Sequence, residues 1–345
     1  MILVTGGTGL LGSHLLVQLV VQLVASNQKV RAIYRDEKSQ INTLNTFRYY
    51  HDNAEALFNQ IEWVEGDMLD VMSLEAALDG INQVYHCAAT VSFEPKDEPF
   101  MNKVNIEGTA NLVNLCLPIE GLRFCFVSSV AAIGREKGIE EVITEENEWK
   151  ESKFNSAYAV SKQGAEMEVW RGITEGLDAF MVNPSVILGP GDWTKSSGAL
   201  FSKVWKGLPF YTRGGNCFVD ARDVSDAMIG LMNTQIKAER FIVGAENRFF
   251  RDVFARIAKN MGKTPPSIEA LPWMAELTWR VEKVTSVLAR KKPFITKETA
   301  RQAMHINRYD SSKLLNALPA FRFRKLDASL DFICEQFMKD YATPR

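Results

Sequence analysis

The first twelve residues, MILVTGGTGLLG, constrain the fold of this chain more than any other stretch. A short apolar run ends in a glycine-rich turn, and an apolar helical pattern begins at Leu10. The turn has the spacing G-x-G-x-x-G with one further glycine in front: Gly6, Gly7, Gly9 and Gly12. Glycines let the backbone turn tightly and approach a pyrophosphate, and the start of the helix supplies amide donors. The stretch therefore predicts the strand, turn and helix with which a dinucleotide-binding Rossmann unit begins.

Short apolar runs then alternate with helical patterns through the first half of the chain. The strand candidates are QKVRAIYR (28–35), IEWVEGD (61–67), QVYHCAA (83–89) and RFCFVSS (123–129), followed later by DAFMVNPSVILGP (178–190) and ERFIVGA (239–245). Strands that alternate with helices are typical of α/β proteins with a doubly wound parallel sheet. The sequence therefore predicts a Rossmann α/β fold.

The chain is long enough for a second, smaller domain, which we expect to be discontinuous. The dinucleotide-binding domain is predicted at 1–184, with a later return at about 218–260. Residues 185–217 and 261–345 are predicted to form the substrate-binding and capping region. Two helical patterns, 272–292 and 295–304, lie in its second segment. We expect this region to cover the carboxyl ends of the strands, where ligands of such sheets bind.

Net charge and residue spacing disfavour several classes of function. A net charge of −2 provides no basic surface for nucleic acid or for an anionic membrane, so we expect neither partner. The five cysteines show no C-x-x-C spacing, which favours reduced thiols and a cytoplasmic location. The four histidines have no metal-ligand spacing, and no G-x-S-x-G elbow is present. Metal-dependent and serine-hydrolase chemistry are therefore disfavoured.

The segment SAYAVSK places Tyr158 and Lys162 four residues apart, on one face of a predicted helix. A phenol has a pKa of about 10, so it exchanges protons near neutral pH only when a nearby cation such as Lys162 stabilises the phenolate. Upstream, a predicted strand ends in Ser128 and Ser129, whose hydroxyls are expected at the carboxyl edge of the sheet. We interpret Ser129, Tyr158 and Lys162 as candidate catalytic residues.

TGGTGLLG, the strand that ends in serines, and YAVSK occur in an order that resembles the extended short-chain dehydrogenase/reductases, the NAD-dependent epimerase/dehydratase family. The segments VRAIYRD, FVSSVAAIG and VNPSVILGP are most similar to its dihydroflavonol 4-reductase-like branch. The resemblance implies that Tyr158 is the general acid/base, Lys162 its pKa modulator and ribose anchor, and Ser129 the hydrogen-bond donor to the substrate oxygen. Asn105 looks like the helix asparagine of this family, with either a structural or a catalytic role.

The resemblance also implies which residues contact the cofactor. The expected cofactor-binding set is Gly6, Thr8, Gly9, Leu10, Leu11, Gly12, Arg35, Asp67, Met68, Ala88, Ala89, Tyr158, Lys162, Pro184 and Ser185. NAD-selective members end the second strand in an acid, whereas this chain has Tyr34 followed by Arg35. Because an arginine can pair with a 2′-phosphate, NADP(H) is favoured. NAD(H) stays possible because Asp36 follows directly.

The branch implies reduction of a ketone or aldehyde, and we expect an apolar small-molecule carbonyl substrate. A sugar-nucleotide epimerase or dehydratase that uses NAD is an alternative, although Val130 and Ala131 stand where family dehydratases carry an acidic pair. A non-catalytic, NADP-binding regulatory protein is a second alternative, which the intact catalytic trio disfavours. Similar proteins often dimerise through the helix that carries the tyrosine, so we expect a homodimer. Candidate pocket residues are Ser92, Phe93, Ile133, Trp193 and Phe201.

Overall fold

The computed structural model describes residues 1–23, 28–134, 142–152, 155–271, 273–274, 279–280 and 297–342. Most of the helix predicted at 272–292 lies outside the described residues. The helix predicted at 295–304 is represented by α12, Lys297–Gln302.

Within the described residues, seven parallel strands form the central sheet in the order β11-β7-β5-β4-β1-β2-β3. They are β1 (Ile2–Thr5), β2 (Val30–Tyr34), β3 (Ile61–Glu65), β4 (Gln83–His86), β5 (Arg123–Val127), β7 (Asp178–Pro184) and β11 (Arg240–Val243). The chain runs outward from β1 to one edge and returns to build the other side. This doubly wound order confirms the predicted Rossmann α/β fold.

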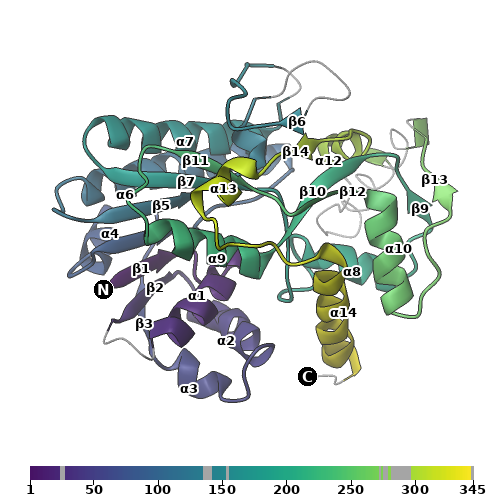
Figure 1. Cartoon of the computed structure of the whole chain (residues 1–345), viewed down its shortest axis with the longest axis horizontal. Coiled ribbons are helices and arrows are strands. Elements are labelled where there is room, and N and C mark those ends of the chain that lie inside the picture. The colour runs from purple at the N-terminus through teal and green to yellow at the C-terminus, as the bar shows by residue number, and fades with distance from the viewer. Residues whose placement is uncertain are drawn as a thin grey trace.

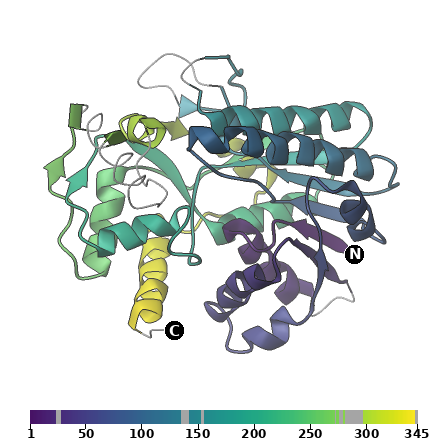
Figure 2. The same cartoon turned by 180° about the vertical axis from the view of Figure 1, so that it is seen from behind.

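Strand side chains alternate between two apolar layers, as a parallel sheet buried on both faces requires. Ile2 and Val4 belong to one layer, whereas Leu3 belongs to the other. Helices α1, α2 and α9 cover the first face, and α4, α6 and α7 cover the second (Figures 1 and 2). The helices of this part are α1 (Leu10–Leu23), α2 (Gln40–Arg48), α3 (Ala54–Phe58), α4 (Val71–Ala77), α5 (Glu98–Asn102), α6 (Gly108–Cys116), α7 (Ala157–Thr174) and α9 (Ala221–Met232).

A smaller part lies beyond the carboxyl ends of the central strands, on the right in Figure 1. Its sheet has the order β12-β10-β8, with β8 Val186–Leu188, β10 Gly215–Asp220 and β12 Glu246–Phe249. Helices α8 (Gly198–Trp205), α10 (Phe250–Asn260) and α14 (Leu326–Ala342) enclose an apolar core with this sheet. The remaining elements are β6 (Val142–Ile143) paired with β14 (Arg308–Tyr309), β9 (Phe210–Tyr211) paired with β13 (Ile268–Glu269), and α13 (Ser312–Ala317).

Two boundaries differ from the sequence prediction. Of the return expected at 218–260, only α9 and β11 join the layers of the central sheet, whereas β10, β12 and α10 build the smaller part. The stretch 178–190 divides into β7 and β8, which belong to different sheets. The division falls at Ser185, whose N–H is still bonded to the Val243 carbonyl of β11. Beyond it, β8 pairs with β10 instead.

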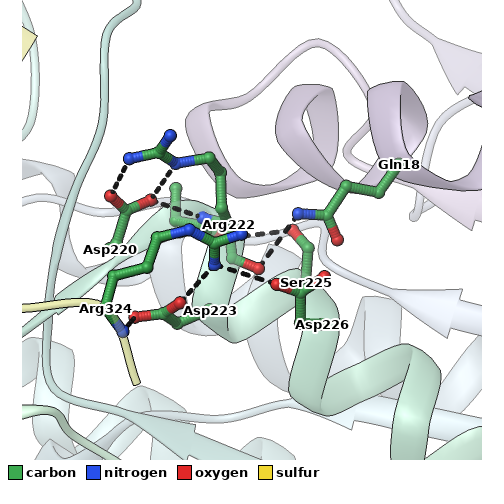
Figure 3. Close-up of polar contacts among 8 residues, drawn as sticks. Gln18, Asp220, Arg222, Asp223, Ser225, Asp226 and Arg324 are labelled. Atoms are coloured by element: carbon green, nitrogen blue, oxygen red, sulfur yellow. Dashed lines mark hydrogen bonds and ion pairs between the residues drawn. The ribbon is translucent and has the colours of Figure 1, made fainter. Parts of the chain in front are cut away.

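Ion pairs join the segment just before α14, which carries Arg324, to α9 (Figure 3). Arg324 donates from its main-chain N–H and its guanidinium to Asp223, and its guanidinium also reaches Asp226 at 2.9 Å. The Asp223 side chain is fully buried. Burial raises the pKa of Asp223 to about 6, although the hydrogen bonds and charge of Arg324 oppose the rise.

A second ion pair lies beside the first (Figure 3). Arg222 donates to the buried Asp220 at 2.6 Å, and its guanidinium lies over the Phe332 ring of α14 at 4.6 Å. Burial alone would raise the pKa of Asp220, but the hydrogen bonds and charge of Arg222 hold it below the usual range. Gln18 of α1 donates to the Arg222 carbonyl at 3.1 Å. These contacts link α1, α9 and α14, so this junction joins the two parts of the chain.

Candidate active site

The predicted site residues gather at one edge of the central sheet. Because all seven strands are parallel, the residues that follow them meet at the same edge. The glycine turn follows β1, Arg35 follows β2, and Asp67 lies just beyond β3. Ala88 and Ala89 follow β4, Ser129 follows β5, and Pro184 and Ser185 lie at the end of β7. The sequence prediction therefore assembles into one region without rearrangement.

The turn between β1 and α1 admits only glycine at its closest approaches. Gly6 has a φ of +68°, and a Cβ there would lie 2.7 Å from the Cα of Ala88. A Cβ on Gly12 would lie 2.2 Å from the carbonyl oxygen of Gly6. The turn points toward the first turn of α1, whose N–H groups have no acceptors within the helix. Such a turn and helix start fit the pyrophosphate of a dinucleotide.

A cavity of about 140 Å³ adjoins the turn, and the smaller part closes its other side. Its lining includes Thr8, Gly9, Leu10, Asn42, Lys195 and Ser196. The two parts of the chain therefore meet over the glycine turn.

Helix α7 positions Tyr158, the candidate catalytic tyrosine. Its N-cap, Ser156, accepts a hydrogen bond from the Ala159 N–H at 2.9 Å, which fixes the first turn and Tyr158 within it. Burial raises the pKa of Tyr158, and the nearby Ser129 hydroxyl opposes this rise. Ser129 itself begins a short 3₁₀ helix, Val130–Ala132, and accepts from the Ala131 N–H at 3.1 Å. The structure thus brings the predicted serine and tyrosine into contact.

Lys162 is buried one helical turn beyond Tyr158. Its ammonium donates to the Val127 carbonyl at 2.7 Å and lies 4.4 Å from the centre of the Phe126 ring. Burial lowers the pKa of Lys162 to about 8, and the negative charge of Glu166 opposes the decrease. Tuning of the tyrosine by this lysine, expected from the spacing, stays a prediction, because burial and Ser129 are the influences on Tyr158 seen here.

Asn105 and His86 form buried hydrogen bonds next to the candidate site. Asn105 lies in a π-helical segment, Lys103–Glu107, and its amide contacts the Thr90 N–H, the Thr90 carbonyl and the Ser161 hydroxyl at 2.7–3.0 Å. These bonds fix the loop after β4 against α7, which favours the structural role for Asn105. His86 contacts the Thr5 and Thr109 hydroxyls at 2.7 and 3.0 Å. Burial lowers its pKa to about 3, so it is a neutral structural group.

The remaining predicted contacts have distinct surroundings. Arg35 lies 3.8 Å from the Asp67 carboxylate, and both side chains are partly exposed. Met68 is buried and touches Gly108 on α6. The Ser185 hydroxyl lies beside the Cys217 thiol of β10, next to Gly244, and the Ser185 N–H donates to the Val243 carbonyl. Ser185 therefore directs its hydroxyl toward the smaller sheet.

The pocket candidates divide into two groups. The Phe93 ring lies 5.9 Å from the Tyr158 ring, centre to centre, so it borders the candidate catalytic phenol. Trp193 and Phe201 were the wrong choice, because both are buried in the core of the smaller part. Trp193 also donates to Asp340 at 2.8 Å. Aromatic residues in an insertion fill that insertion's own core before they line a pocket.

Sequence reasoning missed Glu166, which is buried on α7. Its carboxylate contacts Ser128 on one side and Asn183 and Arg240 on the other. The spacing Tyr158, Lys162, Glu166 repeats every four residues, so the helical periodicity places all three on one face. That signal was available in the sequence, but the partners of Glu166 were not.

A glycine turn at the start of a doubly wound sheet, with a Ser-Tyr-Lys trio at the same edge of that sheet, defines a Rossmann-fold protein of the NAD(P)-binding class. The model of the NAD dependent epimerase/dehydratase family matches residues 2–244. The chain belongs to this family. Members and structural neighbours bind NAD(P), and they include oxidoreductases, epimerases and dehydratases.

Several individual proteins are similar to this chain over most of its length. The chain is 29% identical over 323 residues to the Synechocystis protein named "Putative dihydroflavonol 4-reductase", covering 91% of this chain and 88% of the relative. It is 27% identical over 319 residues to sterol demethylase protein B of Methylococcus capsulatus, with the same coverage. The crystal structure of UDP-glucose 4-epimerase from Thermotoga maritima superposes with a TM-score of 0.76 over 99% of each chain, at 18% identity. This last likeness establishes a shared fold.

No helix in the described part of the chain is long and apolar enough to cross a membrane. Among the same residues, no group of three or more histidine, cysteine, aspartate or glutamate side chains is arranged to hold a metal ion.

Proposed function

We propose that this protein is an NADP(H)-dependent oxidoreductase that reduces a ketone or aldehyde, with Ser129, Tyr158 and Lys162 as catalytic residues. The observation that carries the proposal is the placement of the Ser129 hydroxyl beside the Tyr158 phenol, with the buried Lys162 amine one helical turn away. These groups lie at the carboxyl edge of the sheet, where ligands of this fold bind. The Synechocystis relative carries the name of a reductase of this type.

The bound nicotinamide would supply the hydrogen and electron pair that reach the carbonyl carbon. As negative charge develops on the carbonyl oxygen, the Tyr158 phenol donates its proton to that oxygen. The Ser129 hydroxyl donates a hydrogen bond to the same oxygen and afterwards to the Tyr158 phenolate. The charge of Lys162 favours this phenolate, which solvent then reprotonates.

The surroundings of Tyr158 favour an apolar substrate. Phe93 packs edge-on against the phenol ring, with 5.9 Å between the ring centres. A substrate oxygen bound between Ser129 and Tyr158 would therefore lie next to apolar surface. This supports a hydrophobic ketone or aldehyde over a sugar nucleotide.

The neighbours of Arg35 support a preference for NADPH. The Asp36 carboxylate caps a short 3₁₀ helix, Glu37–Ser39, by accepting from the Lys38 N–H at 3.1 Å. It is therefore engaged by its own chain, whereas the Arg35 guanidinium lies across the ends of β2 and β3. An exposed guanidinium there can bind a 2′-phosphate.

Arg35→Ala is expected to weaken NADPH binding by about 10- to 100-fold, because charge-assisted hydrogen bonds to the phosphate are lost. NADH binding should weaken by less than about threefold, since its ribose carries no 2′-phosphate. Fluorescence titration with both cofactors measures the two constants. Arg48→Ala is a matched control, because Arg48 is also a surface arginine paired with an acid, Glu55. Equal losses of the two cofactors in Arg35→Ala would contradict 2′-phosphate recognition.

The test of the reaction is a substrate panel with purified protein and the tighter-binding cofactor. Stoichiometric oxidation of NADPH by aromatic aldehydes or by ring-bearing ketones supports the proposal. Conversion of UDP-glucose with tightly bound NAD that is not consumed would replace it with the epimerase alternative. NADPH binding without turnover of any carbonyl compound would indicate the regulatory alternative.

We further propose a cytoplasmic homodimer formed through α7. Val160 and Met167 lie seven residues apart on α7 and are 43% and 53% exposed, so they form an apolar stripe suited to a second copy. All five cysteines are free thiols, which suits a reducing compartment. Light scattering on the purified protein tests the dimer: a mass of one chain at micromolar concentration would contradict it.

A further inference from the structure

Glu166 is a buried carboxylate that the proposed reaction leaves unexplained. It is 3% exposed and lies on α7, one turn beyond Lys162 and two turns beyond Tyr158. Burying a charge is costly unless each oxygen finds donors. The position therefore calls for a compensating role.

The donors to Glu166 come from two strands of the central sheet, β7 and β11, and from the residue that follows β5. One oxygen accepts from the Ser128 hydroxyl at 2.7 Å and from the Asn183 amide at 3.1 Å. The other oxygen forms an ion pair at 3.0 Å with Arg240 on β11. Arg240 also donates to the Glu145 carbonyl at 2.6 Å, so its guanidinium is held in place independently.

These contacts fix the segment that carries Ser129. The Asn183 amide group that reaches Glu166 also donates to the Ser129 carbonyl at 3.0 Å. The neighbouring Ser128 is held at both ends, because its hydroxyl binds Glu166 and its N–H binds the Val182 carbonyl at 2.8 Å. The Glu166 carboxylate therefore holds in place the main chain that carries the Ser129 hydroxyl.

The same carboxylate is the negative charge nearest to Lys162 along α7. The other groups that face Lys162 are the Val127 carbonyl, the Phe126 ring, the Cys87 thiol and the His86 imidazole. Burial keeps the thiol protonated, with a pKa raised to about 12, and keeps the imidazole neutral. Glu166 therefore supplies the anion that stabilises the charged amine in a buried position.

We propose that Glu166 is a positioning residue of the active site, which holds Ser129 through Ser128 and Asn183 and keeps the Lys162 amine charged beside Tyr158. The proposal rests on the proposed function for its catalytic consequence. Its electrostatic part concerns the protein alone.

The test compares two substitutions that disturb the same network with opposite charge. Glu166→Gln removes the anion and leaves Arg240 uncompensated, so the pKa of Lys162 should fall from about 8 by about one unit. Arg240→Gln removes the cation and leaves the anion, so the same pKa should rise by about half a unit. Both variants weaken the anchor, so a purely structural role would not produce shifts of opposite sign.

The first readout is the Lys162 titration in cofactor-free protein, followed by NMR of ¹³C-labelled lysine and assigned by the loss of its signal in Lys162→Arg. Glu168→Gln is the matched control, because Glu168 is two residues away on α7 and pairs with Arg171 at 2.9 Å. Its Lys162 pKa should equal that of the wild type. No shift in Glu166→Gln, or shifts of the same sign in the two test variants, would overturn the proposal.

The second readout is the pH dependence of carbonyl reduction. In Glu166→Gln the alkaline limb should move to lower pH by the same unit, since the amine loses its proton earlier, and in Arg240→Gln it should move to higher pH. If the wild type reduces no carbonyl compound, the proposed function fails while the NMR result still decides the role of Glu166. If the NMR shifts are seen but the alkaline limb does not follow them, Glu166 has no catalytic consequence and the proposal is rejected.

Discussion

Glu166 and Asp223 are both buried carboxylates paired with an arginine, yet their surroundings differ. Glu166 accepts from Ser128 and Asn183 as well as from Arg240, and all three donors belong to the central sheet or the residue that follows a strand. Asp223 accepts from Arg324 alone among the hydrogen bonds found, through both its guanidinium and its main-chain N–H. One carboxylate has distributed donors close in space to the catalytic residues, and the other depends on a single residue 101 positions away.

The difference indicates that the two networks have different roles. The network around Glu166 joins α7 to the central sheet and contacts the segment of Ser129, where we propose that its charge acts on the reaction. The junction network around Asp223 connects α9 with the segment that leads into α14, so it acts on the association of the two parts. We therefore expect substitution of Tyr158 itself to change turnover with little effect on stability, and substitutions at the junction to do the reverse.

The largest expected effect is on turnover in Tyr158→Phe. Loss of the acidic proton should lower kcat by about 10²- to 10⁴-fold. Only the interaction of the phenol with Ser129 is lost, so the free energy of unfolding should change by no more than about 1 kcal/mol. Steady-state kinetics and urea unfolding measure the two quantities. Tyr341→Phe makes the same chemical change on α14 and should leave kcat unaltered.

Retained turnover in Tyr158→Phe would remove its role as the acid. A large loss of stability in the same variant would show that Tyr158 also stabilises the fold.

The next effect is on stability in Arg324→Met. Methionine keeps much of the side-chain volume but leaves Asp223 buried without its cation, which should lower the free energy of unfolding by about 2–4 kcal/mol. The lower end allows for the partial exposure of Arg324, whose side chain is 37% accessible. The kcat of the folded fraction should stay within about threefold of the wild type. Urea unfolding and steady-state kinetics at low temperature check both.

Arg322→Met is the control for that experiment. Arg322 lies two residues earlier on the same segment, is exposed, and donates to the Pro319 and Phe321 carbonyls. Its loss should change stability by less than about 0.5 kcal/mol. Equal destabilisation in the two variants would mean that the ion pair with Asp223 does not fasten the junction.

The two networks also explain where sequence reasoning succeeds. The glycine turn at 6–12 and the spacing of Tyr158 and Lys162 are local patterns, and each depends on backbone geometry within a few residues. Parallel strands then bring their ends to one edge, which is why local patterns sufficed to assemble the predicted site.

Contacts between residues far apart in the chain could not be predicted from the sequence. Glu166 and Arg240 are 74 positions apart, and nothing local indicates that β11 would place a guanidinium against α7. For the same reason, Trp193 and Phe201 were taken for pocket residues, since aromatic character does not reveal which of two cores a side chain enters. The extent of the return after β7 was also misjudged, because both β10 and β11 are short apolar strands and only their partners distinguish them.

The smallest expected effect is a pH dependence that belongs to the junction. The pKa of Asp223 is about 6 in the folded protein and about 4 in the unfolded chain. Between these values the folded protein holds a proton that the unfolded chain has released, so stability from this group is fully present below about pH 4 and is lost as the pH rises through 6. Asp223→Asn cannot titrate, so it should lose about 1–2 kcal/mol less stability than the wild type between pH 4.5 and pH 7.

Urea unfolding of both proteins at several pH values measures this difference. The neighbouring charges, Asp220, Asp226 and Arg324, are common to both proteins, so the difference isolates Asp223. Parallel pH profiles would show that Arg324 compensates the buried carboxylate as fully as the distributed donors are proposed to compensate Glu166. The contrast between the two networks would then lie only in what each one touches, with Ser129 and Lys162 at the first and α14 at the second.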